Sequence, residues 1–252
     1  MLTETELETY HQDGYITSPF RMPADVLEDI KARHARLVAA KPQYADYCPA
    51  LLEHDLGFAD YCRQPEILDK VEQILGPDFA LWNCSFFAKP ALTGSTTPWH
   101  QDGEYWPIRP LATCTVWLAL DDSTMENGCL RVVKGSHKDT EIKQHQTNNG
   151  PGLALNRELM ASEYDESLAD DLVLQAGQMS LHDIFLLHGS EPNRSAQSRR
   201  GMTMRFMPTT SLFDRAIAAE QAEKFGFVSH ENRQVILMRG VDRHGGNEFY
   251  PL

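Results

Sequence analysis

The sequence has 252 residues, enough to bury a substantial core, and a β-rich fold of this length can form a single domain. Its formal net charge of -13 argues against nucleic acid as a partner, because phosphate binding needs clustered lysine and arginine. Since no stretch approaches the roughly 18 apolar residues of a membrane helix and the first residues carry no targeting pattern, we expect a soluble, cytoplasmic protein without a membrane partner.

The first 78 residues are expected to be mainly helical. Thr3 and Glu6 form a capping box and Gly14 is a stop signal, so a short helix lies between them. A second amphipathic helix is predicted over residues 23–42 and a third over 65–76, because apolar residues recur there at helical spacing after a proline. The chain between these two helices shows no clear pattern.

From residue 79 the apolar period changes to two, which indicates strands. Strands are expected in the segments 79–89, 99–102, 113–120, 129–133, 177–183, 184–188 and 201–207. Residues 138–171 are polar and are predicted to form a long loop with at most short helices, which would suit a lid or substrate loop. A helix around 215–225 and a segment over 235–240 without an assignable role complete the chain.

Helices followed by many short strands favour a mainly β fold with flanking α-helices. We expect a double-stranded β-helix of the jelly-roll or cupin-like type, with the N-terminal helices packed on one sheet. The predicted organisation is one domain over 1–252, with a helical part (1–78), a barrel core (79–210) and a C-terminal extension (211–252). Five cysteines without a Cys-x-x-Cys motif predict reduced, mostly buried thiols.

A candidate metal site lies in residues 99–107, WHQDGEYWP. In an extended strand His100 and Asp102 project to the same side, while Gln101 points away. A third ligand is expected from His188, which an apolar strand delivers just before a glycine. Two histidines and one carboxylate on one face of an ion leave other positions open, as in non-haem Fe(II) oxygenases.

Other histidines compete with this assignment. Residues 11–14 repeat the sequence HQDG, but on a helix side chains two apart lie about 200° apart and cannot share an ion. His137 and the pair His182-Asp183 are interpreted as chance candidates. His188 is preferred because Ser190 and Arg199 follow it, and a metal with a fixed guanidinium suits a small dicarboxylate co-substrate.

The predicted substrate site rests on the polar face of the strand over residues 79–89. Candidate substrate-binding residues on this face and near the metal strand are Asn83, Ser85, Phe87, Tyr105, Trp106 and Arg109. The loop near Asn148 and Asn149 is a further candidate. A small molecule is the expected partner, because ligands bind in the mouths of such barrels.

The chain resembles the phytanoyl-CoA dioxygenase family of Fe(II)/2-oxoglutarate oxygenases. The matching stretches are WHQDGEYWPIRP (99–110), TVWLALDDSTMENGCLRVVKGSH (115–137) and HGSEPNRSAQSRRGMTMR (188–205), and the opening helix with Gly14 and Tyr15 also fits. The resemblance implies that the catalytic metal ligands are His100, Asp102 and His188.

The resemblance also implies a co-substrate site. Arg199 and Ser190 would hold the C5 carboxylate of 2-oxoglutarate, and the family spacing selects Arg199 over its neighbour Arg200. Trp117 and Thr115 would line the co-substrate pocket, and Trp106 would lie beside the metal. Arg205 is interpreted as an ion-pairing strand residue.

The implied reaction is hydroxylation of an unactivated C–H bond of a small molecule, with 2-oxoglutarate and O2 converted to succinate and CO2. Related halogenating enzymes lack the carboxylate, so Asp102 favours hydroxylation. A cupin-type metal-dependent isomerase or a thiol dioxygenase would use the same barrel without needing Arg199. A non-enzymatic jelly-roll binding protein would keep the metal residues as core polar groups. The primary substrate and the oligomeric state are not predicted.

Overall fold

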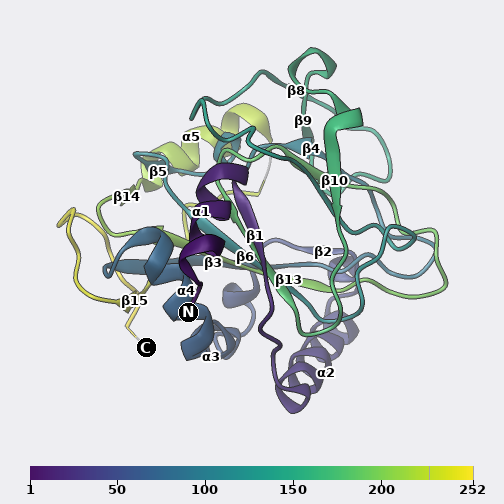
Figure 1. The fold of residues 1–252 in the computed structure, drawn as a ribbon, viewed down its shortest axis with the longest axis horizontal. Coiled ribbons are helices and arrows are strands. Elements are labelled where there is room, and N and C mark those ends of the chain that lie inside the picture. Colours follow the sequence, from purple (N-terminus) through teal and green to yellow (C-terminus); the bar gives the residue numbers. More distant parts are fainter. Residues whose placement is uncertain (227, 252) are drawn as a thin grey trace.

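Two main antiparallel sheets, two further two-stranded sheets and five α-helices are found in the computed structural model, which describes residues 1–226 and 228–251 (Figure 1). The larger sheet has the order β1 (Tyr15–Ser18), β11 (Met179–Asp183), β6 (Cys114–Ala119), β13 (Gly201–Pro208), β3 (Phe79–Phe87) and β15 (Ile236–Arg239), and β2 (Tyr47–Cys48) also pairs with β3. The smaller sheet has the order β10 (Ala169–Leu172), β7 (Leu130–Val133), β12 (His188–Ser190) and β4 (Thr97–His100). The predicted mainly β fold with flanking helices is confirmed.

Three N-terminal helices begin and end close to the predicted residues: α1 (Glu4–Asp13), α2 (Ala24–Ala40) and α4 (Pro65–Leu75). The short helix α3 (Phe58–Cys62) lies in the segment where no pattern was found. Thr3 and Glu6 form the expected capping box on α1, and Gly14 ends it in the left-handed conformation, with φ of 83°. Apolar side chains of α2, α3 and α4 share one core cluster with the larger sheet, so the helices cover that sheet's outer face.

Short strands occur in two regions where none was predicted. The helical part before residue 79 also contains β1 and β2. The expected long loop over 138–171 contains the hairpin of β8 (His145–Thr147) and β9 (Arg157–Leu159), and then β10. The loop prediction was wrong because these strands have largely solvent-accessible faces, so they need no apolar alternation to form a ladder.

The C-terminal segment completes the larger sheet. Helix α5 covers Arg215–Phe225 as predicted, with Asp214 accepting from the backbone at its start. The segment without an assigned role forms β15, which pairs antiparallel with the edge of β3. A second two-stranded sheet joins β14 (Leu212–Phe213) to β5 (Ile108–Arg109). All five cysteines are buried and free, as expected, and no helix of the described residues has the length and apolar character needed to cross a membrane.

The buried ring of His34 on α2 makes stability depend on pH. It packs against Phe86 of β3 with ring centroids 4.2 Å apart. Burial, aided by the charge of Arg200, lowers the pKa of His34 from 6.5 to about 4. In the unfolded chain this histidine takes up a proton at higher pH than in the folded protein. Its contribution to stability is therefore complete above pH 6.5 and is lost as the pH falls from 6.5 toward 4.

We expect His34→Leu to lose less stability on acidification than the wild type. Between pH 7 and pH 5 the wild type should lose about 2 kcal/mol more unfolding free energy than the variant, because each pH unit below the pKa of the unfolded histidine costs about 1.4 kcal/mol. Urea unfolding of both proteins at the two pH values measures it. Equal losses in the two proteins would show that His34 is not responsible.

Candidate active site

The three predicted metal ligands come from neighbouring strands of the smaller sheet. His100 ends β4 and lies directly opposite His188, the first residue of β12. The apolar residues before His188 form a turn rather than the predicted strand, so the strand begins with the histidine. Asp102 follows an extended Gln101 and begins one turn of 3-10 helix, Asp102–Glu104. The alternation that was expected to bring His100 and Asp102 to one side therefore holds up to Asp102.

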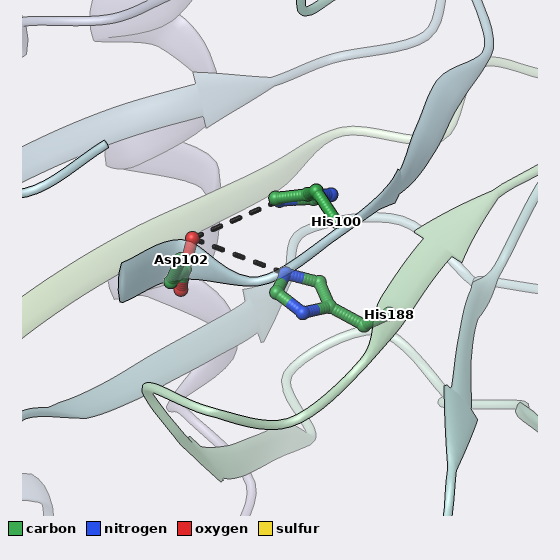
Figure 2. Close-up of side chains that lie close together, drawn as sticks. All are labelled: His100, Asp102 and His188. Carbon is green, nitrogen blue, oxygen red and sulfur yellow. Dashed lines mark ion pairs between the residues drawn. The ribbon is translucent and has the colours of Figure 1, made fainter. Parts of the chain in front are cut away.

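The side chains of His100, Asp102 and His188 converge (Figure 2). Nε2 of His100 lies 3.7 Å from Oδ1 of Asp102, and Nε2 of His188 lies 4.0 Å from the same oxygen. One ion with bonds of about 2.1 Å to each atom can lie between atoms at these separations. Among the described residues, this trio is the group of His, Cys, Asp and Glu side chains close enough together to hold a metal ion. All three are buried.

Backbone carbonyls set the orientation of both imidazoles. Nδ1 of His100 lies 2.8 Å from the carbonyl oxygen of Pro98, and Nδ1 of His188 lies 2.9 Å from that of Leu186. Because a carbonyl oxygen can only accept, each Nδ1 carries the hydrogen and each Nε2 keeps a lone pair. This is the arrangement that orients metal-binding histidines in proteins.

The second oxygen of Asp102 is held from the larger sheet. Thr115 of β6 donates to Oδ2 at 3.3 Å, and Nε2 of His182 on β11 lies 3.4 Å from the same oxygen. Thr115 and His182 are paired residues of adjacent strands. Oδ1 is therefore left to face the two ligand histidines. His182 was set aside in the sequence as a chance candidate, because only the strand register shows that it faces Asp102.

The protonation states favour a cation site. Burial opposes ionisation of Asp102, but contacts with His100 and His182 outweigh it, and the pKa of the carboxyl lies well below its usual range. Burial and the neighbouring His100 hold the pKa of His188 well below its usual value. A carboxylate and a neutral imidazole are the forms in which these side chains bind metal. The residues present therefore fit a divalent ion.

Arg199 and Ser190 lie together in a cavity that His100, Asp102 and His188 also line. Arg199 is fully buried, and burial lowers the pKa of its guanidinium to about 10, so it stays charged at neutral pH. Its Nε donates to the carbonyl of Gly128, and Nη2 lies 3.5 Å from Oγ of Ser190. Its guanidinium carbon lies 5.1 Å from the ring centre of Trp117.

Two cavities meet at the metal residues. The narrow cavity, about 30 Å³, reaches Arg199, Ser190, Trp117, Thr115 and His182, and the wide cavity measures about 500 Å³. Both are lined by Phe87, His100, Asp102 and Arg205. At this size the narrow cavity holds only about one or two water molecules, so a larger occupant requires its wall to move apart.

Half of the predicted substrate residues line the wide cavity. Phe87, Tyr105 and Trp106 do so, together with Asn149 of the predicted loop. The wall also contains residues that the sequence did not indicate, namely Gln43, Tyr44, Tyr47, Pro49, Ala154, Leu155, Asn156, Gly226, Val228 and His230. They come from the unpatterned segment after α2, the β8–β9 hairpin and the end of α5.

Asn83, Ser85 and Arg109 do not line either cavity. Asn83 donates to the carbonyl of Pro49, and Ser85 accepts from Arg205. Arg109 donates to backbone carbonyls beside it, that of Ile108 at 2.7 Å among them. These three side chains therefore brace the wall rather than reach the space inside it. Their polar character suggested a cavity because a strand pattern cannot distinguish a buried polar group that is hydrogen-bonded within the protein from one that faces a cavity.

Arg205 was interpreted as an ion-pairing strand residue, and this was wrong. Among the described residues no carboxylate lies within 4.0 Å of its guanidinium, although its charge helps to lower the pKa of Asp102. It is 5% exposed and lines both cavities. Arg205 lines the cavities because of its position in β13, where Thr203 and Arg205 share the face that points between the two sheets.

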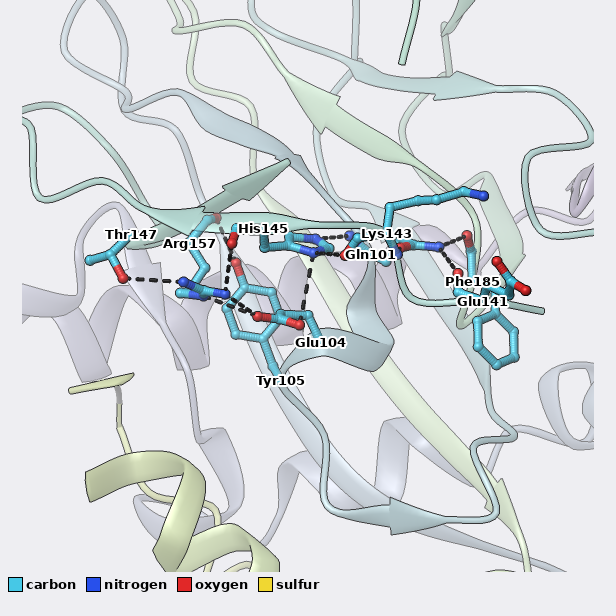
Figure 3. A network of polar contacts seen from close by, with 9 residues as sticks. All are labelled: Gln101, Glu104, Tyr105, Glu141, Lys143, His145, Thr147, Arg157 and Phe185. Carbon is cyan, nitrogen blue, oxygen red and sulfur yellow. Dashed lines mark hydrogen bonds and ion pairs between the residues drawn. The ribbon is translucent and has the colours of Figure 1, made fainter. Parts of the chain in front are cut away.

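Residues next to the metal ligands hold the β8–β9 hairpin over the site (Figure 3). The side-chain amide of Gln101, which points away from the metal site as predicted, donates to the carbonyls of Glu141 and Phe185 and accepts from the backbone of Lys143. Arg157 of β9 forms an ion pair with Glu104, with a second contact at 3.0 Å from its Nε. The hairpin is thus tied to the same turn that carries Asp102.

We expect Glu104→Gln to loosen this hairpin. A hydrogen bond to a charged group contributes about 1.5–3 kcal/mol, so amide hydrogen exchange in residues 143–159 should become roughly ten- to hundredfold faster. Hydrogen–deuterium exchange with mass spectrometry measures this change. The exposed Glu8→Gln has the same change in charge and should leave the hairpin unaffected. Unchanged exchange in Glu104→Gln would show that the pair does not hold the hairpin.

Comparison with known proteins finds chains of similar sequence and fold. The family model described as Phytanoyl-CoA dioxygenase (PhyH) matches residues 10–201. The peroxisomal phytanoyl-CoA dioxygenase of Mus musculus is 34% identical over 235 residues, covering 82% of this chain and 68% of that protein. That of Homo sapiens is 33% identical over 160 residues, covering 61% of this chain and 47% of that protein. The chain thus spans about half the length of the human protein.

Solved structures with the same fold include several oxygenases. A non-heme monooxygenase, ThoJ in its apo form, has a TM-score of 0.73 and 26% identity, covering 97% of this chain and 86% of that chain. The epimerase SnoN, solved with Fe3+, alpha ketoglutarate and nogalamycin RO, has a TM-score of 0.70 and 20% identity, covering 86% and 88%. These matches confirm the cupin-like architecture that was predicted.

Proposed function

Because the chain belongs to the phytanoyl-CoA dioxygenase family of iron- and 2-oxoglutarate-dependent oxygenases, we propose that it hydroxylates an unactivated C–H bond of a small molecule, converting 2-oxoglutarate and O2 to succinate and CO2. His100, Asp102 and His188 would hold Fe(II). Arg199 and Ser190 would bind the far carboxylate of 2-oxoglutarate, with Trp117 and Thr115 in the wall of the co-substrate pocket. The substrate would occupy the wide cavity beside Phe87, Tyr105 and Trp106.

One observation carries the proposal: Oδ1 of Asp102 and the Nε2 atoms of both histidines face one point, where the narrow cavity meets the wide one. Three protein ligands on one face leave the other positions of an ion open. A co-substrate in the narrow cavity and a substrate in the wide cavity would then meet at the metal. This layout explains why the three ligands and Arg199 occur together.

The role of the protein is to position the reactants and to exclude water from them. When bound, iron with 2-oxoglutarate and dioxygen supplies the oxidant that can remove a hydrogen from an unactivated C–H bond. Thr115 and His182 contact Oδ2 of Asp102, which would leave Oδ1 available to hold the ion. The β8–β9 hairpin covers the wide cavity, and its anchoring at Gln101 and Glu104 would keep solvent from the reacting C–H bond.

Substrate-dependent succinate release tests this function. We expect the Fe(II) protein to release succinate from 2-oxoglutarate when a screen of small metabolites reaches a substrate, whose product gains one oxygen atom by mass spectrometry. Succinate with no gain of oxygen would favour epimerisation, the reaction named for SnoN. Turnover without 2-oxoglutarate would favour the cupin-type isomerase or thiol dioxygenase, and failure to bind iron would favour a non-enzymatic binding protein.

A further inference from the structure

Arg205 is a buried cation that lines the wide cavity and forms no ion pair with a carboxylate of the described residues. Its guanidinium carbon lies 5.0 Å from the ring centre of Trp106 and 5.9 Å from that of Phe87. Nη1 donates to Oγ of Ser85, and Nε has no partner among the described residues. An arginine carries five N–H donors, so most of its hydrogen-bonding capacity is left over. A buried charge without a partner is costly, which indicates that a ligand completes the site.

The formal charges at the proposed site indicate the sign of the charge that this ligand carries. Fe(II) contributes two positive charges, Asp102 one negative, 2-oxoglutarate two negative and Arg199 one positive, and these cancel. Arg233 is paired with Glu53. Lys89 lines neither cavity, and its amine donates to the backbone carbonyls of Ser95 and Glu191. Arg205 remains as one uncompensated positive charge.

Resting on the proposed function, we propose that the primary substrate is an organic monocarboxylate whose carboxylate binds Arg205 and whose apolar body lies against the aromatic wall. Tyr44, Tyr47, Phe87, Tyr105 and Trp106 supply that wall. A planar guanidinium matches a carboxylate with two parallel hydrogen bonds. Arg205 lines the wide cavity as well as the narrow one, whereas Arg199 lines only the narrow one. Arg199 therefore suits 2-oxoglutarate in the narrow cavity, and Arg205 suits the substrate carboxylate in the wide one.

A single carboxylate fits this site better than a phosphate. Arg205 offers one positive charge, and the other described residues that line the wide cavity include Asp102 but no lysine or second arginine. A doubly charged phosphate would leave one negative charge uncompensated in a buried position. The formal net charge of -13 further disfavours polyanionic substrates, coenzyme A thioesters among them.

Binding of matched probe pairs to the protein tests the proposal without turnover. The protein is loaded anaerobically with Fe(II) and 2-oxoglutarate and titrated by calorimetry with 3-phenylpropanoate and 3-phenylpropanamide, indole-3-acetate and indole-3-acetamide, and octanoate and octanamide. We expect the carboxylate of at least one pair to bind at least about tenfold more tightly than its amide, the ratio expected for one charge-assisted hydrogen bond. Arg205→Met should remove this preference, and Arg205→Lys should retain part of it.

Controls separate this proposal from the proposed function. Arg194→Met removes the same charge from an exposed position and should keep the full preference. Arg205→Met should still bind Fe(II) and 2-oxoglutarate, as shown by the metal-to-ligand charge-transfer absorbance. If the wild type binds neither Fe(II) nor 2-oxoglutarate, the proposed function itself is wrong.

Three results would overturn the assignment of Arg205 while leaving the proposed function intact. In the first, Fe(II) and 2-oxoglutarate bind but no carboxylate binds more tightly than its amide. In the second, Arg205→Met loses 2-oxoglutarate, which would make Arg205 part of the co-substrate site. In the third, phenyl phosphate binds more tightly than every carboxylate, which would point to a phosphorylated substrate.

Discussion

Asp102→Ala and His100→Ala are each expected to abolish Fe(II) binding and turnover. Each removes one of three ligands whose donor atoms converge on one point, and Asp102 is the only one of them that brings a negative charge. Iron content after anaerobic reconstitution and desalting measures the effect directly. Thermal unfolding of each variant without metal shows whether the fold is kept.

The repeated HQDG segment provides an internal control for this experiment. His11 and Asp13 lie on helix α1, where their side chains cannot share an ion, and His11 is exposed. His11→Ala should therefore bind iron as the wild type does. Loss of iron in His11→Ala together with retention in His100→Ala would overturn the assignment of the metal site.

Arg199→Ala is expected to weaken 2-oxoglutarate binding by at least about tenfold while iron binding survives. The guanidinium would form a bidentate, charge-assisted contact with the far carboxylate, and hydrogen bonds to charged groups contribute about 1.5–3 kcal/mol. Titration of the Fe(II) charge-transfer absorbance with 2-oxoglutarate under anaerobic conditions measures the affinity.

Arg199 also supports the fold, so a second variant is needed. It donates to the carbonyls of Gly128 and Phe87, which alanine would leave unpaired. Arg199→Lys keeps a charge and a donor, and should recover only part of the affinity because an ammonium cannot reproduce the planar fork.

Arg200→Ala is the matched control for co-substrate binding. Arg200 faces away from the cavity and forms a bidentate ion pair with Asp121. Its Nε donates to Oδ2 at 2.8 Å, and its Nη2 donates to Oδ1 at 2.7 Å. Its loss should lower stability without changing the affinity for 2-oxoglutarate. Strong weakening by Arg200→Ala but not by Arg199→Ala would move the co-substrate site by one residue.

Local patterns in the sequence determined the elements whose stability is set by near neighbours. The capping box at Thr3, the glycine stop at Gly14 and the helix before residue 226 are formed by contacts within a few residues, so they were predicted closely. The strands β3, β6 and β13 were predicted from the alternation of side chains along each strand, which is also a local pattern. The spacing of His100 and Asp102 could be interpreted for the same reason, since one residue separates them.

Tertiary structure alone decided which polar side chains enter the site. His182 reaches Asp102 because β11 pairs with β6 in a register that places it opposite Thr115, and that register depends on residues more than 60 positions apart. Arg205 lines the cavities without forming an ion pair with any of the described residues, whereas Arg200 pairs with Asp121. A strand pattern specifies the face on which a side chain lies, but the partner on that face comes from distant chain segments. The grouping of His100, Asp102 and His188 could be predicted from the sequence, while most residues of the wide-cavity wall could not.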